Sequence, residues 1–380
     1  MILYIFAFAF SCALILPAFR LSILSLLISS GSHSELDFSP NDLHVRQIAL
    51  VILVLSTKAL QQSLGLALDL HINSASRSPT TAYSLPALRL RAPVMIKAQD
   101  VLRYHAALDI ATLAPKSPAH YNIFFLAGLS TPLMLLLLAK RSCPILPLGS
   151  VNVRNRFDFL NPRLCHDAAR GLLRALGAEA RLVSPGRRVK RGLEFDVIIE
   201  VTTGKADLVK DQVIFRQTIT LLQFLSRNAE PQFVEEELEQ QGARHLPDSD
   251  LSTFDAVDQK LDIVANAPML WATFCKDYNP IHVSSWAAKT FGFPGKIAHG
   301  NLVAGQAIAV LAGIAGPQFS KMWLPDSKPS WLEVDFKRPM VVPTKLEILI
   351  DEIDERNQVT SHFRIEKESK VYIIGKAGWF

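Results

Sequence analysis

The chain has 380 residues, of which 49% are hydrophobic and 20% are charged, and its formal net charge is +5 at pH 7. This composition excludes a wholly disordered chain, and the length predicts two folded units with additional segments. The small charge excess gives no reason to expect a nucleic-acid partner. Four scattered cysteines without a CxxC pair exclude a disulfide scaffold and a zinc ribbon.

The amino-terminal segment Met1–Ser30 carries a single formal charge, at Arg20. A helix that spans a membrane needs ~20 apolar residues, so this segment is long enough for an anchor. A second apolar stretch, Ile48–Leu68, contains Lys58 and a Gln-Gln pair, which favours an amphipathic helix over a second span. Core helices, or a loosely packed extension, are the alternatives for both segments. Membrane association through residues 1–30 and a cytoplasmic location therefore both stay open.

A linker and a first folded unit are expected next. Residues 73–92 are rich in Ser, Thr and Pro and lack a usable period, as is typical of a linker. Phe124–Leu138 is apolar, but its fifteen-residue length and Pro132 favour a buried helix over a membrane span. Alternating or β-rich patterns predict strands at Leu148–Leu160, Glu194–Val201 and Val213–Leu222.

A basic cluster, SPGRRVKRG, occupies Ser184–Gly192. Pro185, Gly186 and Gly192 bracket it, which favours a charged hairpin turn between two strands. Because no aromatic residues alternate with the basic ones to stack on bases, nucleic-acid binding is not expected.

The second half begins after an acidic run, Val234–Gln241, which is interpreted as a solvated linker or helix face. Gly300–Gly316 is rich in Gly and Ala, so this helix can lie close against a curved sheet in an α+β arrangement. The remaining expected elements are helices at Asp258–Phe274 and Ser284–Thr290 and strands at Ser330–Lys337, Lys345–Ile353 and Lys370–Lys376.

The segment DYNPIH (Asp277–His282) places a carboxylate and an imidazole five positions apart around an Asn-Pro turn. Pro280 holds Asn279 out of the helical region, so the loop can present Asp277 and His282 to one point. Such a pair suits general acid–base chemistry on water, because an imidazole titrates near neutral pH. Taken alone, these six residues also fit an Asx-turn with a surface histidine.

Residues Ile297–Gly300 open the small-residue helix. The start of a helix offers free backbone N–H groups and the positive end of a dipole, which can hold a thioester oxygen as it gains negative charge. An acid–base pair and an oxyanion donor together suffice for adding water to an α,β-unsaturated thioester. This chemistry requires no metal and no other cofactor.

These segments resemble the MaoC-like acyl dehydratases, the hydratase-2 group of (R)-specific enoyl-CoA hydratases with a hot-dog fold. The stretches DYNPIH, AAKTFGFPGKIAHGNL and WLEVDFKRPMVVP carry the resemblance across residues 272–380. A weaker similarity covers residues 118–227, where LPLGSVNVRNRF resembles the non-catalytic first hot dog of double-hot-dog members and where no DxNPxH occurs. The resemblance implies an α+β double hot-dog, in which two long helices are each wrapped by antiparallel sheet. The hydrophobic helical extension expected before it lies outside the resemblance.

By this resemblance, Asp277 and His282 form the catalytic pair, with Asn279 orienting them and Gly300 supplying the oxyanion N–H. The implied substrate-binding residues are Phe293, Lys296, His299 and Asn301. Lys296 or Arg338 would meet the phosphates of coenzyme A, unless they are ordinary surface charges.

One departure from the family pattern precedes the pair. The family usually has Ser-Gly or Thr-Gly before the aspartate, whereas this chain has Cys275-Lys276. Since glycine is conformationally permissive, Lys276 is expected to strain the loop or to change the acidity of Asp277 through its charge. Cys275 is interpreted as a small buried hydrophobe rather than a nucleophile.

The expected organisation is an extension at 1–72, a linker at 73–92, a degenerate hot dog at 93–230, a second linker at 231–257 and the catalytic hot dog at 258–380. The expected reaction is hydration of trans-2-enoyl-CoA to the (R)-3-hydroxyacyl thioester. The alternatives are dehydration of a 3-hydroxyacyl group on an acyl carrier protein, thioester hydrolysis, and a non-catalytic acyl-thioester binding protein. A monomer with internal pseudo-symmetry and a homodimer are equally compatible with the sequence.

Overall fold

Twelve strands of the computed structural model form one sheet, which is antiparallel except where β1 pairs with β3. The structure describes residues 21–63, 82–83, 85–108, 124–146, 150–189, 192–204, 212–224, 255–314, 317–350 and 359–380. In chain order the strands are β1 (His33–Glu35), β2 (Ala82–Tyr83), β3 (Arg89–Met95), β4 (Ser150–Phe159), β5 (Ala175–Val189), β6 (Gly192–Thr202), β7 (Val213–Phe224), β8 (Asp255–Ile263), β9 (Ser330–Phe336), β10 (Thr344–Ile350), β11 (Val359–Lys367) and β12 (Lys370–Trp379).

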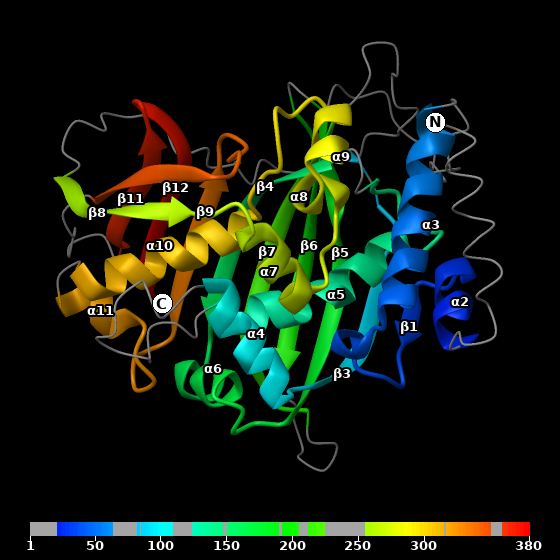
Figure 1. Ribbon diagram of the computed structural model, residues 1–380. Coiled ribbons are helices and arrows are strands. Elements are labelled where there is room, and N and C mark those ends of the chain that lie inside the picture. Colours follow the sequence, from blue (N-terminus) through cyan, green and yellow to red (C-terminus); the bar gives the residue numbers. More distant parts are fainter. Residues whose placement is uncertain are drawn as a thin grey trace.

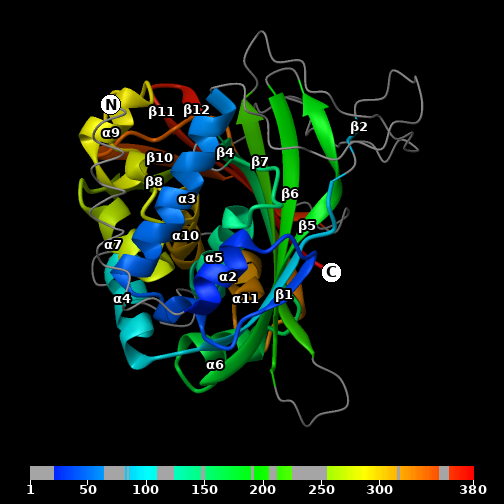
Figure 2. The same cartoon turned by 90° about the vertical axis from the view of Figure 1, so that its right-hand side faces the viewer.

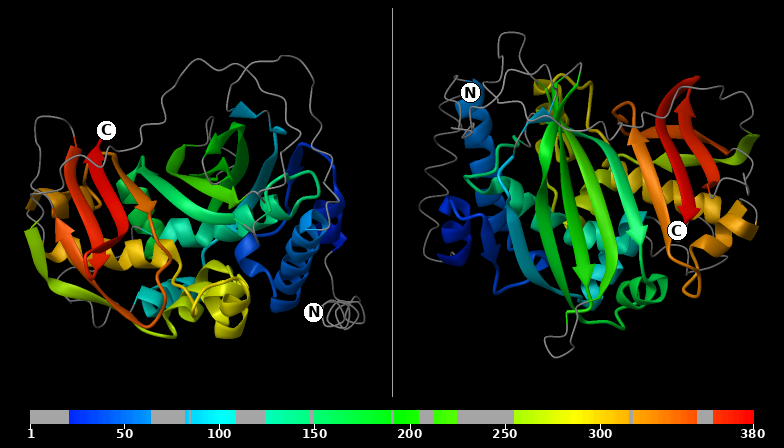
Figure 3. Two further views of the ribbon diagram at one scale, coloured as in Figure 1. Left: turned by 90° about the horizontal axis from the view of Figure 1, so that it is seen from above. Right: turned by 180° about the vertical axis from the view of Figure 1, so that it is seen from behind.

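The sheet has two halves that meet where β4 pairs with β9. The spatial order is β1-β3-β5-β6-β7-β4-β9-β12-β11-β10-β8, and β2 pairs with β5 outside this path. Each half wraps one long helix, α5 (Phe125–Ala139) or α10 (Gly300–Ile314) (Figures 1 and 3). The expected α+β double hot-dog is confirmed.

The shorter helices cover the ends and one side of this arrangement (Figure 2). They are α2 (Leu21–Ile28), α3 (Val45–Ser63), α4 (Ala98–Leu108), α6 (Pro162–Ala169), α7 (Ala267–Cys275), α8 (Pro280–Val283), α9 (Ser285–Thr290) and α11 (Pro317–Met322), with a 3-10 turn, η2, at Pro40–Asp42.

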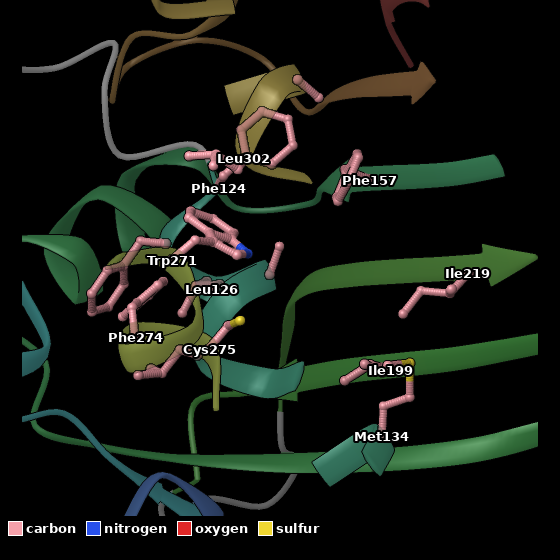
Figure 4. Close-up of a cluster of buried hydrophobic side chains, with 14 of the residues drawn as sticks. Phe124, Leu126, Met134, Phe157, Ile199, Ile219, Trp271, Phe274, Cys275 and Leu302 are labelled. Atoms are coloured by element: carbon pink, nitrogen blue, oxygen red, sulfur yellow. The ribbon is translucent and has the colours of Figure 1, made fainter. Parts of the chain in front are cut away.

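Helix α5 is buried on all sides, as its uniformly apolar sequence predicts. Its Thr131 hydroxyl donates to the Ala127 carbonyl, which satisfies a polar group in this apolar setting. At Gly128 a Cβ would lie 2.2 Å from Cε1 of Phe274, so glycine is required for α7 to pack this closely. Figure 4 shows the resulting cluster, in which Phe274 and Trp271 of α7 pack beside Phe124 and Leu126.

Residues 21–63 pack into the same core as the two hot dogs. Ile23, at the start of this segment, is fully buried, and the main-chain amide of Arg141 donates to the Leu27 carbonyl. The buried ammonium of Lys58 donates to three carbonyls at the carboxyl end of α5, those of Leu138, Lys140 and Cys143, at 2.6–3.0 Å. Burial lowers the pKa of Lys58. This segment is therefore joined to α5 by polar and apolar contacts.

The expected membrane anchor at residues 1–30 lies outside the described residues except for its last ten. Within the part of the chain that the structure describes, no helix combines the length and the apolar character needed to cross a bilayer.

Two expected boundaries fall inside strands. Strand β3 runs across the boundary at 92/93, and β8 runs across the boundary at 257/258. Residues 64–81 of the expected extension and linker, and 225–254 around the acidic run, lie outside the described residues.

The helix expected at Asp258–Phe274 is wrong in its first half, which is strand β8. Leu261 and Ile263 are fully buried while Lys260 and Asp262 between them are exposed, which is the period-two pattern of an edge strand. Helix α7 then begins at Ala267, and Pro268 lies in its first turn, where the missing N–H costs no hydrogen bond. Strand β11 was not expected either. The basic cluster does lie at the β5–β6 hairpin, but Ser184–Val189 belong to β5 and Gly192 begins β6, so most of the cluster is strand and not turn.

Candidate active site

The turn after α7 directs Asp277 towards the interior. Lys276 adopts the left-handed conformation, with φ 58° and ψ 12°, and its amide caps α7 on the Ala272 carbonyl. This is the conformation in which glycine is usual, because a side chain there is strained. The Lys276 ammonium turns back to donate to the Thr273 carbonyl at 2.9 Å. Burial, and then the Arg103 guanidinium, lower the pKa of Lys276.

Asn279 fixes the loop between the two candidate catalytic residues. Its amide donates to Oδ1 of Asp277 at 3.2 Å, and its own side-chain oxygen caps α8 by accepting from the Ile281 amide. Pro280 occupies the first turn of α8, so His282 follows Asn279 within a single helical turn. The loop is thus held by local hydrogen bonds, as the Asn-Pro sequence predicts.

His282 is held in one tautomer by a backbone hydrogen bond. Its Nδ1 lies 2.8 Å from the Ile297 carbonyl oxygen, which can only accept, so Nδ1 carries the proton and Nε2 keeps its lone pair. Burial lowers the pKa of His282, and the Asp277 carboxylate opposes this effect. The ring is therefore neutral at pH 7 and able to accept a proton.

His299 stacks on His282 with ring centroids 3.7 Å apart and an interplanar angle of 27°. Its Nε2 donates to the main-chain oxygen of Asp277 at 3.1 Å and lies 3.9 Å from the carboxylate Oδ2. Burial and the neighbouring His282 ring hold the pKa of His299 well below its usual value. His299 thus ties the start of α10 to the Asp277 loop.

Ligand atoms of Asp277, His282 and His299 lie within 4.8 Å of one another, as in a metal site. The lone pairs of an imidazole lie in its ring plane, and these two planes are nearly parallel and stacked. They cannot both point at one ion at the ~2.0–2.1 Å of a Zn–N bond. The donor set does not fit a resident metal.

The amino end of α10 faces this cluster. The amides of Leu302 and Val303 donate to the His299 carbonyl, and Gly300 is the first residue of the helix. A Cβ at Gly300 would lie 2.5 Å from Cε1 of Phe336, so only glycine fits without a shift of the ring or the helix.

A cavity of about 310 Å³ runs from this cluster into the amino-terminal half. At one end it is lined by Asp277, His282 and the start of α10, and at the other by α5, β4 and β7. The α5 residues are Thr131, Met134, Leu135 and Leu138, which share one helix face.

The structure brings most of the expected site residues to this cavity. The exception is Lys296, which lies outside the lining residues and donates from Nζ to the Ala265 carbonyl at 2.8 Å. Arg338 does line the cavity, and its guanidinium also donates to the Val371 carbonyl. Cys275 is buried, and burial raises the pKa of its thiol well above the usual value, so it stays protonated. The expected residues at the cavity are Asp277, Asn279, His282, Phe293, His299, Gly300 and Asn301.

Two contributions of the amino-terminal half to this site were not predicted from the sequence. The spacing i, i+3, i+4, i+7 from Thr131 could have indicated one face of α5, although nothing marked that face as a cavity wall. No local signal could have shown that Asn155 of β4 donates to Oδ1 of Asn301.

Residues 254–370 match a protein family described as the MaoC like domain. The chain is similar in structure to HtdX of Mycobacterium tuberculosis, with 19% identity, a TM-score of 0.52, and coverage of 77% of this chain and 100% of HtdX. It is also similar to a MaoC-like dehydratase of Phytophthora capsici, with 13% identity, a TM-score of 0.53, and coverage of 78% and 97%. No curated protein sequence matches the chain.

Proposed function

We propose that this chain, whose residues 254–370 form a MaoC-like domain, reversibly hydrates trans-2-enoyl-CoA thioesters to (R)-3-hydroxyacyl-CoA. The observation that carries the proposal is the convergence of an unprotonated imidazole nitrogen, a carboxylate and a helix start on one end of a cavity. General acid–base catalysis and oxyanion stabilisation are the two contributions that this reaction needs.

In the proposed mechanism, His282 and Asp277 hold one water molecule. Nε2 of His282 removes a proton from this water as its oxygen bonds to C3 of the enoyl group. The C2=C3 double bond becomes single, and negative charge moves through C2 to the thioester oxygen. The proton then passes from His282 to C2, which completes the addition of one water molecule and returns the imidazole to its neutral form.

The thioester oxygen is proposed to lie against the Gly300 amide. A preorganised N–H group at a helix start stabilises negative charge that develops during the reaction. The close fit of Gly300 against Phe336 supports this role, because it keeps the backbone at the cavity surface free of any side chain.

The acyl chain is proposed to extend along α5 into the amino-terminal half. The lining there includes Met134, Leu135 and Leu138, and burial of each CH₂ group contributes about 0.8 kcal/mol. The non-catalytic hot dog would then determine the length of chain that is accepted.

Loss of absorbance at the enoyl-thioester band tests the proposal, with the full chain, crotonyl-CoA and a longer enoyl-CoA as substrates. We expect both substrates to be hydrated, with only the (R)-product formed. We also expect kcat/KM to fall only below pH 6.5, because the lowered pKa of His282 keeps its ring neutral down to that pH. Release of free thiol would instead indicate thioester hydrolysis. Binding of enoyl-CoA without turnover would indicate a non-catalytic binding protein.

A second candidate is dehydration of a 3-hydroxyacyl group on an acyl carrier protein. The exposed side chains of Lys337 and Arg338 at the cavity favour it, because carrier proteins are acidic. Reversing both charges would slow turnover of a carrier-bound substrate more than that of a short enoyl-CoA if the carrier protein is the physiological partner.

A further inference from the structure

A hydrogen bond between the two hot dogs reaches the start of helix α10. Nδ2 of Asn155, on β4 of the non-catalytic half, donates to Oδ1 of Asn301, the second residue of α10. Asn155 itself is fully buried, whereas Asn301 lines the cavity directly after Gly300. The amino-terminal half therefore contacts the candidate oxyanion site through a side chain.

Asn155 is held rigidly by its place in the sheet. Its strand is paired on both sides, so that Asn155 lies opposite Ile219 of β7 and opposite Val334 of β9. Next to it, the Arg154 guanidinium forms an ion pair with Asp335 at 2.6 Å across the β4–β9 junction. A side chain on a rigid element can hold a partner more accurately than one on a loop.

The Asn155 carboxamide is costly for stability alone. Its Oδ1 is buried and has no hydrogen-bond partner in the part of the chain that the structure describes. A buried acceptor without a partner destabilises the fold, and an apolar residue of similar size would avoid this cost. The bond to Asn301 is the feature that an apolar residue could not supply.

We infer that Asn155 is a positioning residue that orients the Asn301 amide as a second donor, beside the Gly300 N–H, to the thioester oxygen. Because Oδ1 of Asn301 accepts from Asn155, the Nδ2 hydrogens of Asn301 are left for a ligand in the cavity. This inference rests on the proposed enoyl-thioester hydration and deepens it, since it gives the non-catalytic half a direct part in charge stabilisation.

Three variants test the direction of this bond. In Asn155→Asp a carboxylate can only accept, so the Asn301 amide would turn and present its oxygen to the substrate oxygen. We expect kcat to fall ~10²-fold with a smaller change in KM, the size of effect seen when one oxyanion donor is lost. Asn155→Ala removes the orientation without reversing it and should lower kcat less than Asn155→Asp does. In an Asn301→Ala background, Asn155→Ala should have no further effect on kcat.

Gln217→Ala is the matched control. Gln217 is fully buried on β7, and both of its side-chain polar atoms lack a partner among the described residues. Its replacement should change the urea midpoint but leave kcat unchanged. If Asn155→Ala lowers kcat no more than Gln217→Ala does, and Asn155→Asp behaves like Asn155→Ala, the inference is overturned.

A spectroscopic measurement keeps this test separate from the proposed function. Hexadienoyl-CoA bound to a His282→Gln variant should absorb at longer wavelength than in solution, because donors at the thioester oxygen polarise the conjugated system. Adding Asn155→Asp should abolish most of this red shift, and an unchanged shift would overturn the inference. If the wild-type chain hydrates no enoyl-CoA, the proposed function fails, while the shift still decides whether Asn155 orients a donor.

Discussion

The starts of the two central helices differ, although α5 and α10 occupy equivalent places in the two hot dogs. Helix α10 begins at Gly300, which lines the cavity. Helix α5 begins at Phe125, which is fully buried, and the amide of Phe124 before it donates to the Tyr104 hydroxyl. The start of α5 is thus closed by packed aromatic side chains, and its side face lines the cavity instead. The same arrangement of helix and sheet thus places the candidate catalytic groups in the carboxy-terminal half and a wall of the cavity in the amino-terminal half.

The largest effect is expected at the candidate catalytic pair, and it tests whether the reactive groups lie in the carboxy-terminal half. Asp277→Asn and His282→Gln should each lower kcat/KM for crotonyl-CoA by ~10²–10⁴-fold, as is typical for general acid–base groups. The double variant should be little worse than either single variant, because the two residues act on one water. Initial rates, with circular dichroism to verify folding, would measure this. Full activity in either single variant would contradict the assignment of chemistry to the carboxy-terminal half.

A smaller loss is expected when the start of α10 is disturbed. Gly300→Ala places a Cβ against the Phe336 ring, and the resulting shift of the helix start should reduce kcat ~10²-fold. Gly313→Ala on the same helix is the control, since no atom lies within 4 Å of the added methyl group. That variant should keep its activity and gain up to about 1 kcal/mol of stability from helix propensity. Equal kinetics for the two variants would remove Gly300 from the oxyanion site.

The amino-terminal half should control chain length without affecting chemistry on short substrates. Met134→Trp places a large ring on the α5 face of the cavity and should reduce kcat/KM for a long enoyl-CoA at least ~10-fold, the lower end of what a pocket contact discriminates. Crotonyl-CoA should react at nearly the wild-type rate. Met134→Leu, which conserves volume, is the control. Parallel losses on both substrates would show that the chain does not extend along α5.

The smallest of these effects concerns the attachment of residues 21–63. Lys58→Met removes the ammonium that donates to three carbonyls at and just beyond the end of α5, and it should lower the free energy of unfolding by about 1–3 kcal/mol. Thr57→Ala changes the exposed neighbour on the same helix and should have little effect. Urea midpoints measure both variants.

An unchanged midpoint in Lys58→Met would mean that this segment unfolds separately from the hot dogs. Removal of residues 1–92 provides a harsher comparison. It deletes β1, α3 and half of β3, so we expect the truncated chain to be insoluble.

Local signals account for what could be predicted. The turn at Asn279-Pro280, the helix start at Gly300 and the apolar run of α5 each depend on neighbouring residues, and their positions agree with the sequence analysis. The contacts of Lys58 with α5 and of Asn155 with Asn301 join residues 80 or more positions apart. Hydrophobic periodicity relates only residues within one helix or strand, so it cannot predict such distant pairs. Strand β8 was missed because its buried positions, Leu261 and Ile263, run directly into the apolar start of α7.

The β4–β9 junction determines how a ligand can move through the molecule. Asn155 pairs with Val334 and Phe157 with Leu332 within a continuous hydrogen-bonded ladder. The halves therefore cannot swing apart like a hinge without breaking backbone hydrogen bonds, although the cavity extends into both. Under the proposed function, a long enoyl thioester would therefore have to enter and leave while the two halves stay joined along this ladder. For such a substrate, the rate of escape would depend on the length of the tail that has to be withdrawn.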